Sequence, residues 1–240
     1  MNSVLSFFNV SRPWDVSWAH RVNSQALLQR YCASRDVMMI EGDISRSAET
    51  GQVIMAHPPR RESDLAFEGW IEGVAKARKG AKLDFKDPSV VLPCLEALRG
   101  DGQMPIFLNA DILEGPGGPA SRFEAEAFIA VCNRLCPEGI LSVGWTTGHV
   151  EGGRYSEEMI DRMLKVCERM EGSVTFPVRA YYMRDSWKVL KRLLERPEDT
   201  LTIWNSEAVE EEFKAWVKGE VDPGRVFYDL MDRDGMPIRL

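Results

Sequence analysis

The sequence of 240 residues lacks any apolar run that approaches the roughly 20 residues needed to cross a membrane. Its first ten residues contain no lysine or arginine, and their apolar run is interrupted by polar residues. They therefore lack both the basic segment and the continuous apolar segment of a signal peptide. We expect a cytoplasmic protein without a transmembrane segment.

Cysteine is far less frequent than in disulfide-rich proteins, and its number is odd, which argues against a disulfide framework. Cys132 and Cys136 are four positions apart, but no second pair of metal-binding residues follows near them. A zinc site is therefore not indicated, and we expect packed thiols in a reducing compartment. The five cysteines are Cys32, Cys94, Cys132, Cys136 and Cys167.

Positive charge is also in short supply. The net charge is −7, and the sequence contains no long run of lysine and arginine. Both features argue against general nucleic-acid binding. A local phosphate site remains compatible with this balance, because net charge does not describe a single cleft.

The remaining composition is that of a soluble globular protein, with 44% hydrophobic and 28% charged residues. No repeat and no low-complexity tract is visible. We expect one domain over residues 1–240, with an N-terminal extension at 1–16 and a C-terminal tail at 232–240.

Apolar runs alternate with helical patterns along the chain. Asp87 and Pro88 are an N-cap and first helical residue, and Ser121 with Glu124 is a predicted capping box. The expected strands are 18–21, 37–44 extended by 53–57, 81–86, 105–112, 140–146, 174–181, 201–204 and 226–231. The expected helices are 24–32, one ending near Gly80, one from 87 to Gly100, one from 121 to Pro137, 156–170, 185–195, and 206–218 closed by Gly219.

Strict alternation of strands and helices implies a parallel sheet, and eight units in 240 residues fit a (β/α)8 TIM barrel. No helix is expected after the last strand. The alternative is a doubly wound open sheet, which is disfavoured because no glycine-rich phosphate loop follows the first strand.

Charged residues inside the apolar strands are the most informative feature. Successive side chains of a strand point to opposite faces, so Glu41 and Asp43 share one face, and so do Lys82, Asp84 and Lys86. Because an unpaired buried charge is expensive, such residues indicate a functional cluster. In a barrel, function gathers at the carboxyl ends of the strands.

The cluster predicts a metal site with acid and base partners. The carboxylates of Glu41, Asp43 and Asp84 suit one Mg²⁺ or Ca²⁺ ion. His20 and His57, each at the end of an apolar run, would supply an acid and a base. An ion network without metal, and histidines that serve only as structural hydrogen-bonding residues, are the alternatives.

Further residues could reach the same pocket. Lys82 and Lys86 could bind anionic oxygens, Asn109 shares a strand face with Asp111, and Arg179 shares one with Thr175 and Pro177. Trp145 belongs to the core or to the pocket wall, and His149 lies in a glycine-rich loop where we expect it to be solvated.

These residues also carry a resemblance. His20-Arg21, Glu41-Gly42-Asp43, His57 and Asp84-Phe85-Lys86 resemble the glycerophosphodiester phosphodiesterase pattern, and the last is closer to the sphingomyelinase D toxins of the same phospholipase-C-like barrel superfamily. Over most of residues 18–230 the chain resembles the menorin family. The shared segments are Trp18-Ala19-His20, Val22-Asn23-Ser24, Ile54-Met55-Ala56-His57-Pro58-Pro59, Lys82-Leu83-Asp84-Phe85-Lys86, Asn109-Ala110-Asp111-Ile112-Leu113, Gly144-Trp145-Thr146-Thr147-Gly148, Thr175-Phe176-Pro177-Val178-Arg179 and Leu201-Thr202-Ile203-Trp204.

The resemblance implies roles for single residues. Glu41, Asp43 and Asp84 would hold the metal, and His20 with His57 would form the acid/base pair. Lys86 would contact the phosphate, and Trp204 would line the substrate pocket. Val22 stands where the phosphodiesterase His-Arg-Gly motif has glycine, and the Glu-Asn-Thr segment that follows it there is missing.

The sequence therefore predicts a metal-dependent phosphodiesterase acting on a small phosphodiester such as a phospholipid head group, a glycerophosphodiester or a nucleotide. A substrate with a neighbouring hydroxyl is expected to give a cyclic phosphate first. The alternative is a catalytically silent barrel that binds a phosphorylated ligand or a protein partner.

Overall fold

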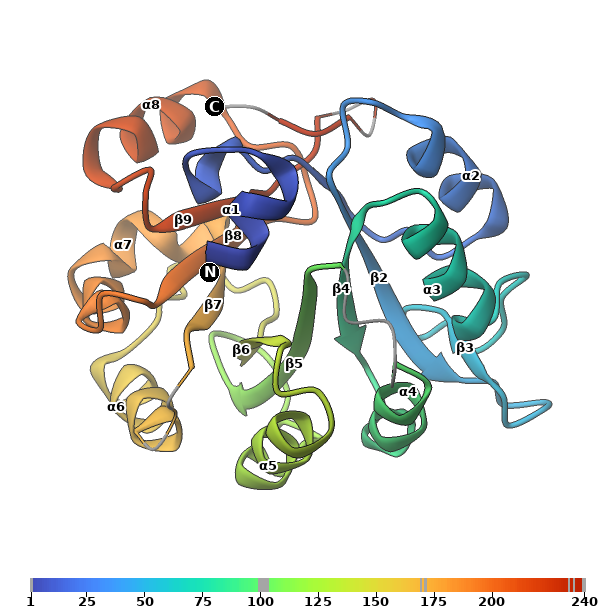
Figure 1. Cartoon of the computed structure of the whole chain (residues 1–240). Coiled ribbons are helices and arrows are strands. Elements are labelled where there is room, and N and C mark those ends of the chain that lie inside the picture. Colours follow the sequence, from blue (N-terminus) through green and yellow to red (C-terminus); the bar gives the residue numbers. More distant parts are fainter. Residues whose placement is uncertain are drawn as a thin grey trace.

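The computed structural model describes residues 2–98, 104–168, 170, 172–232, 234 and 236–238. Eight parallel strands follow one another around a barrel in the order β1-β2-β4-β5-β6-β7-β8-β9. The first and last of them, β1 and β9, lie side by side, so the barrel is nearly closed (Figure 1). The strands are β1 (Trp18–Ala19), β2 (Met39–Arg46), β4 (Gly80–Phe85), β5 (Ile106–Glu114), β6 (Ile140–Thr146), β7 (Val174–Arg179), β8 (Thr200–Trp204) and β9 (Val226–Asp229).

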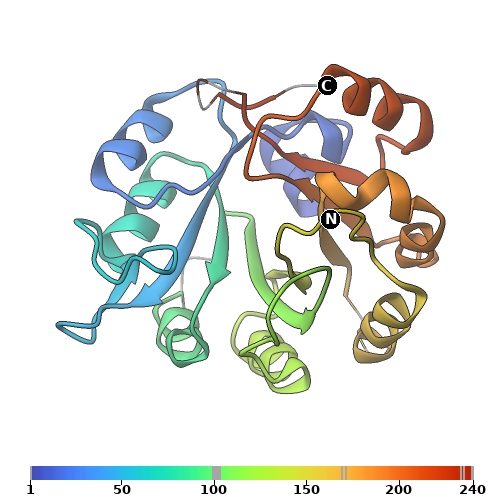
Figure 2. The same ribbon diagram turned by 180° about the vertical axis from the view of Figure 1, so that it is seen from behind.

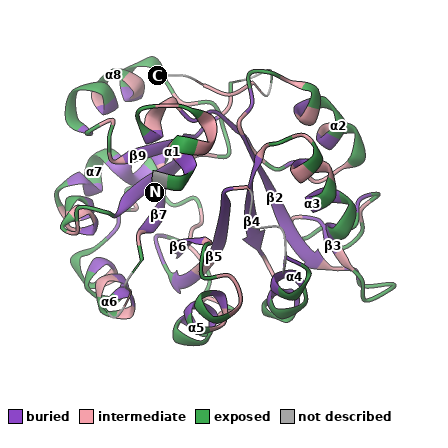
Figure 3. Cartoon of the chain, in the orientation of Figure 1, coloured by how far each residue is buried: buried purple, intermediate pink, exposed green. Residues whose placement is uncertain are grey.

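Helices surround the barrel, as the reverse view also shows (Figure 2). Outward-pointing strand residues such as Ile40, Leu83 and Val143 are fully buried against the helices. The strands are therefore buried along their length, while each surrounding helix exposes its outer side (Figure 3). The helices are α1 (Asn2–Phe8), α2 (Gln25–Ala33), α3 (Phe67–Lys76), α4 (Val91–Ala97), α5 (Ala125–Leu135), α6 (Glu157–Cys167), α7 (Ala180–Leu190) and α8 (Glu211–Glu220), with 3-10 turns η1 (Pro13–Asp15), η2 (Pro88–Val90) and η3 (Lys191–Leu194).

This architecture confirms the predicted (β/α)8 barrel and excludes the open doubly wound sheet, because consecutive barrel strands are neighbours throughout. The predicted cap at Asp87 is present, since its side chain accepts from the Ser89 N–H. Within the described residues no helix follows β9; Met231 instead pairs with Pro237. None of the described helices is long and apolar enough to cross a membrane.

The segment 53–57 is not an extension of a barrel strand. Its residues Val53–Met55 form a separate strand, β3, which pairs antiparallel with the end of β2. The polar loop after β2 therefore folds back as a hairpin, and His57 lies just beyond that hairpin rather than at a barrel strand end. Apolar periodicity alone does not distinguish the two arrangements.

The predicted capping box of Ser121 and Glu124 is wrong. The Ser121 hydroxyl donates to the Asp111 carbonyl and accepts from the Phe123 N–H, which fixes a turn before the helix. Helix α5 begins only at Ala125, with Glu124 as an N-cap whose side chain does not cap. The hydrogen bonds of Ser121 therefore stabilise a turn instead of a helix start.

Other boundaries also move. Helix α7 begins directly after β7, five residues before the predicted start, whereas α8 begins at Glu211 rather than at 206. Gly80 starts β4 instead of ending a helix, and Gly219 lies inside α8. The predicted helix end at Gly100 lies outside the described residues.

The N-terminal segment closes the amino end of the barrel. Val4 of α1 and Val16 are buried against inward-pointing residues of the first layer of the barrel. In that layer the rings of Trp18, Phe107 and Phe227 meet edge to face, with centroids 5.2 to 5.8 Å apart. An apolar floor therefore lies under the barrel interior.

The layer above this floor is polar. Thr175 and Thr202 share a hydrogen bond of 2.7 Å between their hydroxyls. TIM barrels usually fill this volume with branched apolar side chains, so a polar layer here indicates function. Its buried members are Glu41, Lys82, Asn109, Ser142, Thr175, Thr202 and Asp229.

Candidate active site

A cavity of about 260 Å³ opens at the carboxyl ends of the barrel strands. Parallel strands bring their carboxyl ends to one edge, so residues far apart in the sequence meet there. The cavity is lined by His20, Arg21, Asp43, His57, Lys82, Asp84, Lys86, Asn109, Asp111, Thr147, Pro177, Arg179, Trp204 and Ser206.

Three buried carboxylates gather at one wall of this cavity. Glu41, Asp43 and Asp84 each offer an oxygen, and these oxygens lie within 4.8 Å of one another. The register of the sheet explains the meeting, because Asp43 of β2 is directly paired with Asp84 of β4. Among the described residues, this is the one group of three or more His, Cys, Asp or Glu side chains that could hold a metal ion.

Neighbouring side chains fix both aspartates. Asn23 donates to Asp43 at 2.6 Å and accepts from its backbone N–H, and Asn109 donates to Asp84 at 2.9 Å. The Lys86 ammonium lies 2.6 Å from Asp84 and 3.4 Å from Asp43. Burial alone would raise the pKa of Asp43, but Lys86 and its other partners lower it.

Asn109 is itself held in one orientation. The Ser142 hydroxyl donates to its side-chain oxygen at 2.6 Å, so its NH₂ group must be the one that faces Asp84. A chain of hydrogen bonds therefore runs from β6 through β5 to the carboxylate on β4.

Glu41 is less well satisfied. Its Oε2 accepts from the Arg21 N–H, and Arg21 adopts the left-handed backbone conformation (φ 57°) at this point. Its Oε1 is buried and has no hydrogen-bond partner in the part of the chain that the structure describes. Burial raises the pKa of Glu41 to about 7, and its acidic neighbours add to that effect. A buried orphan oxygen beside two further carboxylates fits a cation.

His20 faces the cluster from the end of β1. Its Nδ1 lies 3.0 Å from Asp229 and 3.4 Å from Glu41. Burial alone would lower the pKa of His20, but these two carboxylates raise it to about 9. The two carboxylates therefore favour the protonated ring, with Nδ1–H directed at Asp229.

Asp229 is the site residue that sequence reasoning missed. Its side chain is fully buried and divides its oxygens between His20 and the Lys82 ammonium, which is 2.9 Å away. Burial alone would raise the pKa of Asp229, but these two cations hold it well below its usual range. The signal was available, because Asp229 is a carboxylate inside the apolar run 226–231, as Glu41 is in its own strand.

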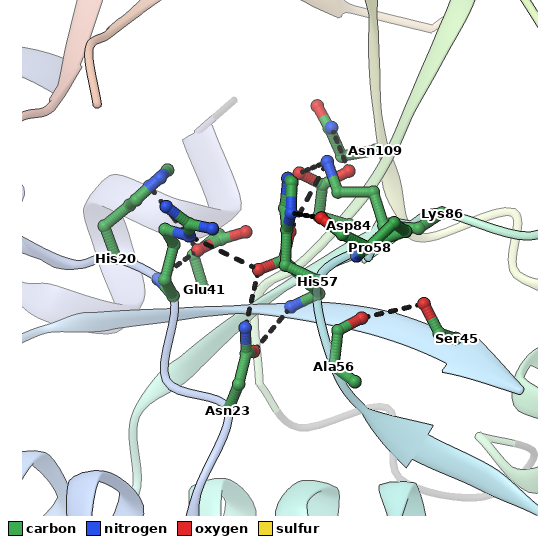
Figure 4. A network of polar contacts seen from close by, with 12 residues as sticks. His20, Asn23, Glu41, Ser45, Ala56, His57, Pro58, Asp84, Lys86 and Asn109 are labelled. Carbon is green, nitrogen blue, oxygen red and sulfur yellow. Dashed lines mark hydrogen bonds and ion pairs between the residues drawn. The ribbon is translucent and has the colours of Figure 1, made fainter. Parts of the chain in front are cut away.

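His57 reaches the same space from the loop after β3. Figure 4 shows it between the His20–Glu41 side and the Asp84–Lys86 side of the site. Its Nδ1 lies 2.5 Å from the Pro58 carbonyl oxygen. Because a carbonyl only accepts, Nδ1 carries a proton. The loop is tied to the cluster, since the N–H of Ala56 donates to the Asp43 carbonyl.

The opposite wall carries Arg179 at the end of β7 and Trp204 at the end of β8. Asp111 also lines the cavity, and burial raises its pKa to about 6. His149 is exposed and stacks on Tyr181 outside the lining, and Trp145 is buried in the core. The structure thus brings together all ten sequence-predicted site residues: nine line the cavity, and Glu41 is buried next to two of them, Asp43 and Asp84.

Comparisons with known proteins agree with this architecture. Residues 13–234 match the Menorin N-terminal domain family. The human protein FAM151B is 36% identical over 230 residues, which cover 91% of this chain and 83% of that protein.

Among solved structures, a glycerophosphodiester phosphodiesterase from Thermotoga maritima aligns with a TM-score of 0.50 at 13% identity, over 89% of this chain and 94% of that one. At this identity the likeness shows the fold alone. A D-allulose 3-epimerase from Methylomonas sp., solved with D-allulose, aligns less well (TM-score 0.46, 14% identity, 89% and 83% coverage) and supports no inference. Because the family match and the human relative each span most of the chain, this protein belongs to the menorin family.

Proposed function

We propose that this protein is a metal-dependent phosphodiesterase that holds one divalent cation, Mg²⁺ or Ca²⁺, through Glu41, Asp43 and Asp84. The observation that carries the proposal is the orphan oxygen of Glu41, buried in a three-carboxylate cluster that faces two histidines. The fold shared with a glycerophosphodiester phosphodiesterase supports the same reaction class.

The donor set fits a hard cation. All three side chains offer carboxylate oxygens, which Mg²⁺ and Ca²⁺ prefer, and all three are buried with their orientations fixed. A bound cation of this kind stabilises the negative charge that develops on phosphoryl oxygens.

The hydrogen bonds of the two histidines assign their roles. His57 directs Nδ1–H at the Pro58 carbonyl, so its Nε2 is the nitrogen that can act as the base. His20 directs Nδ1–H at Asp229, and although burial alone would lower its pKa, Asp229 and Glu41 raise it, which favours the protonated ring. Its Nε2–H is therefore the acid that protonates the leaving oxygen.

With a substrate that carries a neighbouring hydroxyl, we propose internal attack. His57 takes the hydroxyl proton, the hydroxyl oxygen bonds to phosphorus, the bond to the leaving oxygen breaks, and His20 supplies the proton to that oxygen. The product is a cyclic phosphate. An internal nucleophile is favoured because its attack loses little translational entropy.

The remaining lining residues hold the substrate or the catalytic groups. Lys86 projects into the cavity between two aspartates and would contact the phosphate. Lys82 is buried with its ammonium on Asp229, which favours a positioning role toward His20. Asn109 orients Asp84, and Arg179 and Trp204 would contact the rest of the substrate.

A silent barrel remains the second candidate, because Lys86 already pairs with two of the three carboxylates. Such a protein would bind a phosphorylated ligand without turnover. An activity screen separates the two candidates.

The screen uses ³¹P NMR on glycerophosphodiesters, lysophospholipids and linear or cyclic nucleotides, with Mg²⁺ or Ca²⁺ and with EDTA. We expect turnover that needs the cation. His20→Ala and His57→Ala should each lose roughly 10²–10⁴-fold in rate while they keep the metal. The exposed His149→Ala is the matched control and should retain full activity.

Product analysis in ¹⁸O-labelled water tests the cyclic intermediate. A cyclic phosphate at early times supports internal attack. Linear phosphate with solvent oxygen from the first turnover, and no opening of a supplied cyclic phosphate, would overturn it. Binding of the phosphodiesters without any turnover across the panel would favour the silent barrel.

A further inference from the structure

Arg179 lies on the wall of the cavity that faces the carboxylate cluster. The cluster belongs to β2 and β4, whereas Arg179 ends β7 and Trp204 ends β8. Around the eight-stranded barrel, β7 is four places from β2, and β8 is four places from β4. A substrate whose phosphodiester lies at the cluster therefore extends toward Arg179.

Arg179 differs in its charge environment from the other cationic side chains of the cavity. Among the described residues no carboxylate lies within 4.0 Å of its guanidinium, whereas His20, Lys82 and Lys86 each pair with at least one buried carboxylate. A partly buried positive charge of this kind is costly unless an anion meets it.

The hydrogen bonds of Arg179 do not use all the donors of its guanidinium. One terminal nitrogen donates to the Gly148 carbonyl, and the other lies 3.5 Å from the Ser206 hydroxyl, at the limit of a hydrogen bond. The Nε–H is buried and has no hydrogen-bond partner among the described residues. A guanidinium has five donors in a planar fork, so these contacts leave Arg179 able to donate further hydrogen bonds.

Aromatic rings surround the guanidinium. Its central carbon lies 5.7 Å from the ring centroids of Tyr181 and Tyr182 and 5.8 Å from that of Trp204. The rings hold the charge in place, and they are already occupied by a cation. A quaternary ammonium group, which needs open aromatic faces, would meet a like charge here.

We propose that Arg179 binds a second anionic group, a carboxylate or a phosphomonoester, on the substrate whose phosphodiester lies at the carboxylate cluster. The inference rests on the proposed function and narrows its substrate to phosphodiesters with an anionic head group. The cavity of about 260 Å³ suits a small head group of this kind.

The test compares two ligands that differ by one carboxylate: glycerophosphoserine and glycerophosphoethanolamine. Calorimetry uses the full chain with saturating Mg²⁺, in a His57→Ala background so that neither ligand is consumed. We expect glycerophosphoserine to bind roughly tenfold or more tightly, because a hydrogen-bonded charge pair forms only with it.

Variants locate the source of the preference. Arg179→Gln should weaken glycerophosphoserine alone and erase the difference between the ligands, whereas Arg179→Lys should keep part of it. The exposed Arg184→Gln, on helix α7 directly after Arg179, is the control and should preserve the preference. Equal affinities in the parent protein, an equal loss of both ligands in Arg179→Gln, or no binding of either ligand would overturn the inference.

The outcome is separable from the proposed function. Selective binding of glycerophosphoserine by a protein without turnover overturns the proposed phosphodiesterase activity but not the proposed role of Arg179. Turnover without a preference for the carboxylate overturns only the role of Arg179. A further arm replaces glycerophosphoserine by lysophosphatidylserine. Tighter binding of the lipid identifies a lipid head group as the source, and equal binding identifies the free diester. In either case Arg179→Gln must weaken the ligand for the anion site to stand, and unchanged affinity in that variant overturns it.

Discussion

At the scale of single residues, Asp229 couples the barrel interior to the acid/base chemistry. It is the buried carboxylate that both His20 and Lys82 contact, so it fixes the imidazole orientation and its charge. Lys82 lies over the Trp18 ring at 5.9 Å, which places this trio directly on the apolar floor. The acid role proposed for His20 therefore depends on a residue that the substrate does not touch.

We predict that Asp229→Asn lowers the pKa of His20 from about 9 toward 6.5, because the variant keeps the shape but removes the negative charge. NMR titration of the His20 ring measures the change, and the solvent-exposed His149 serves as internal control. An unchanged His20 pKa would show that Glu41, and not Asp229, raises the pKa of His20.

The same variant changes the pH dependence of stability. The pKa of His20 is higher in the fold than in the unfolded chain, so its contribution is fully present below pH 6.5 and is lost as the pH rises through about 9. The free energy of unfolding of Asp229→Asn should therefore fall less steeply over this interval than that of the parent protein, as urea titrations at several pH values would show.

The residue scale also shows how far sequence reasoning reaches. Strand parity correctly placed Glu41 and Asp43 on one face of their strand, and the neighbouring strand carries Asp84 beside them, because side chains alternate along a strand. Asn23, which fixes Asp43, comes from an irregular segment that has no periodicity, so no pattern could reveal it. Asp229 carried the same signal as Glu41 and was overlooked.

At the scale of elements, the barrel strands were predicted well, whereas helix starts were predicted well for α2 and α6 but not for α5, α7 and α8. A barrel strand is buried on both faces, so its apolar run marks it within a residue or two. Helix starts depend on local hydrogen bonds such as the Ser121 turn, and β3 depends on a partner strand that the sequence does not name. Helix α1 was not predicted, because its seven residues are too few to show a clear helical period.

We predict that α1 stabilises the barrel through its floor. Val4 is fully buried against the first layer, so Val4→Ala should cost about 2 kcal/mol of unfolding free energy. Leu92→Ala, at a 46% exposed position, is the control and should change stability little. Urea unfolding measures both. Equal, small effects would mean that α1 is dispensable for the fold.

At the scale of the whole molecule, the barrel separates stability from function along its axis. The floor is apolar and rich in aromatic contacts, the outward faces of the strands pack against helices, and the interior layer above the floor is polar. That layer contains buried hydrogen bonds and charges where an apolar layer would pack without them. Such a loss of apolar packing is expected where a site must be held in a fixed geometry.

The central claim is that the carboxylate cluster holds a divalent cation, and calorimetry with Mg²⁺ and Ca²⁺ tests it most directly. The account predicts one bound ion per chain in the parent protein and its loss in Asp43→Asn. Asp111→Asn is the matched control, because Asp111 lines the same cavity but lies outside the cluster, and it should keep the ion. Equal binding by the parent protein and Asp43→Asn, or no ion bound by the parent protein, would contradict the account.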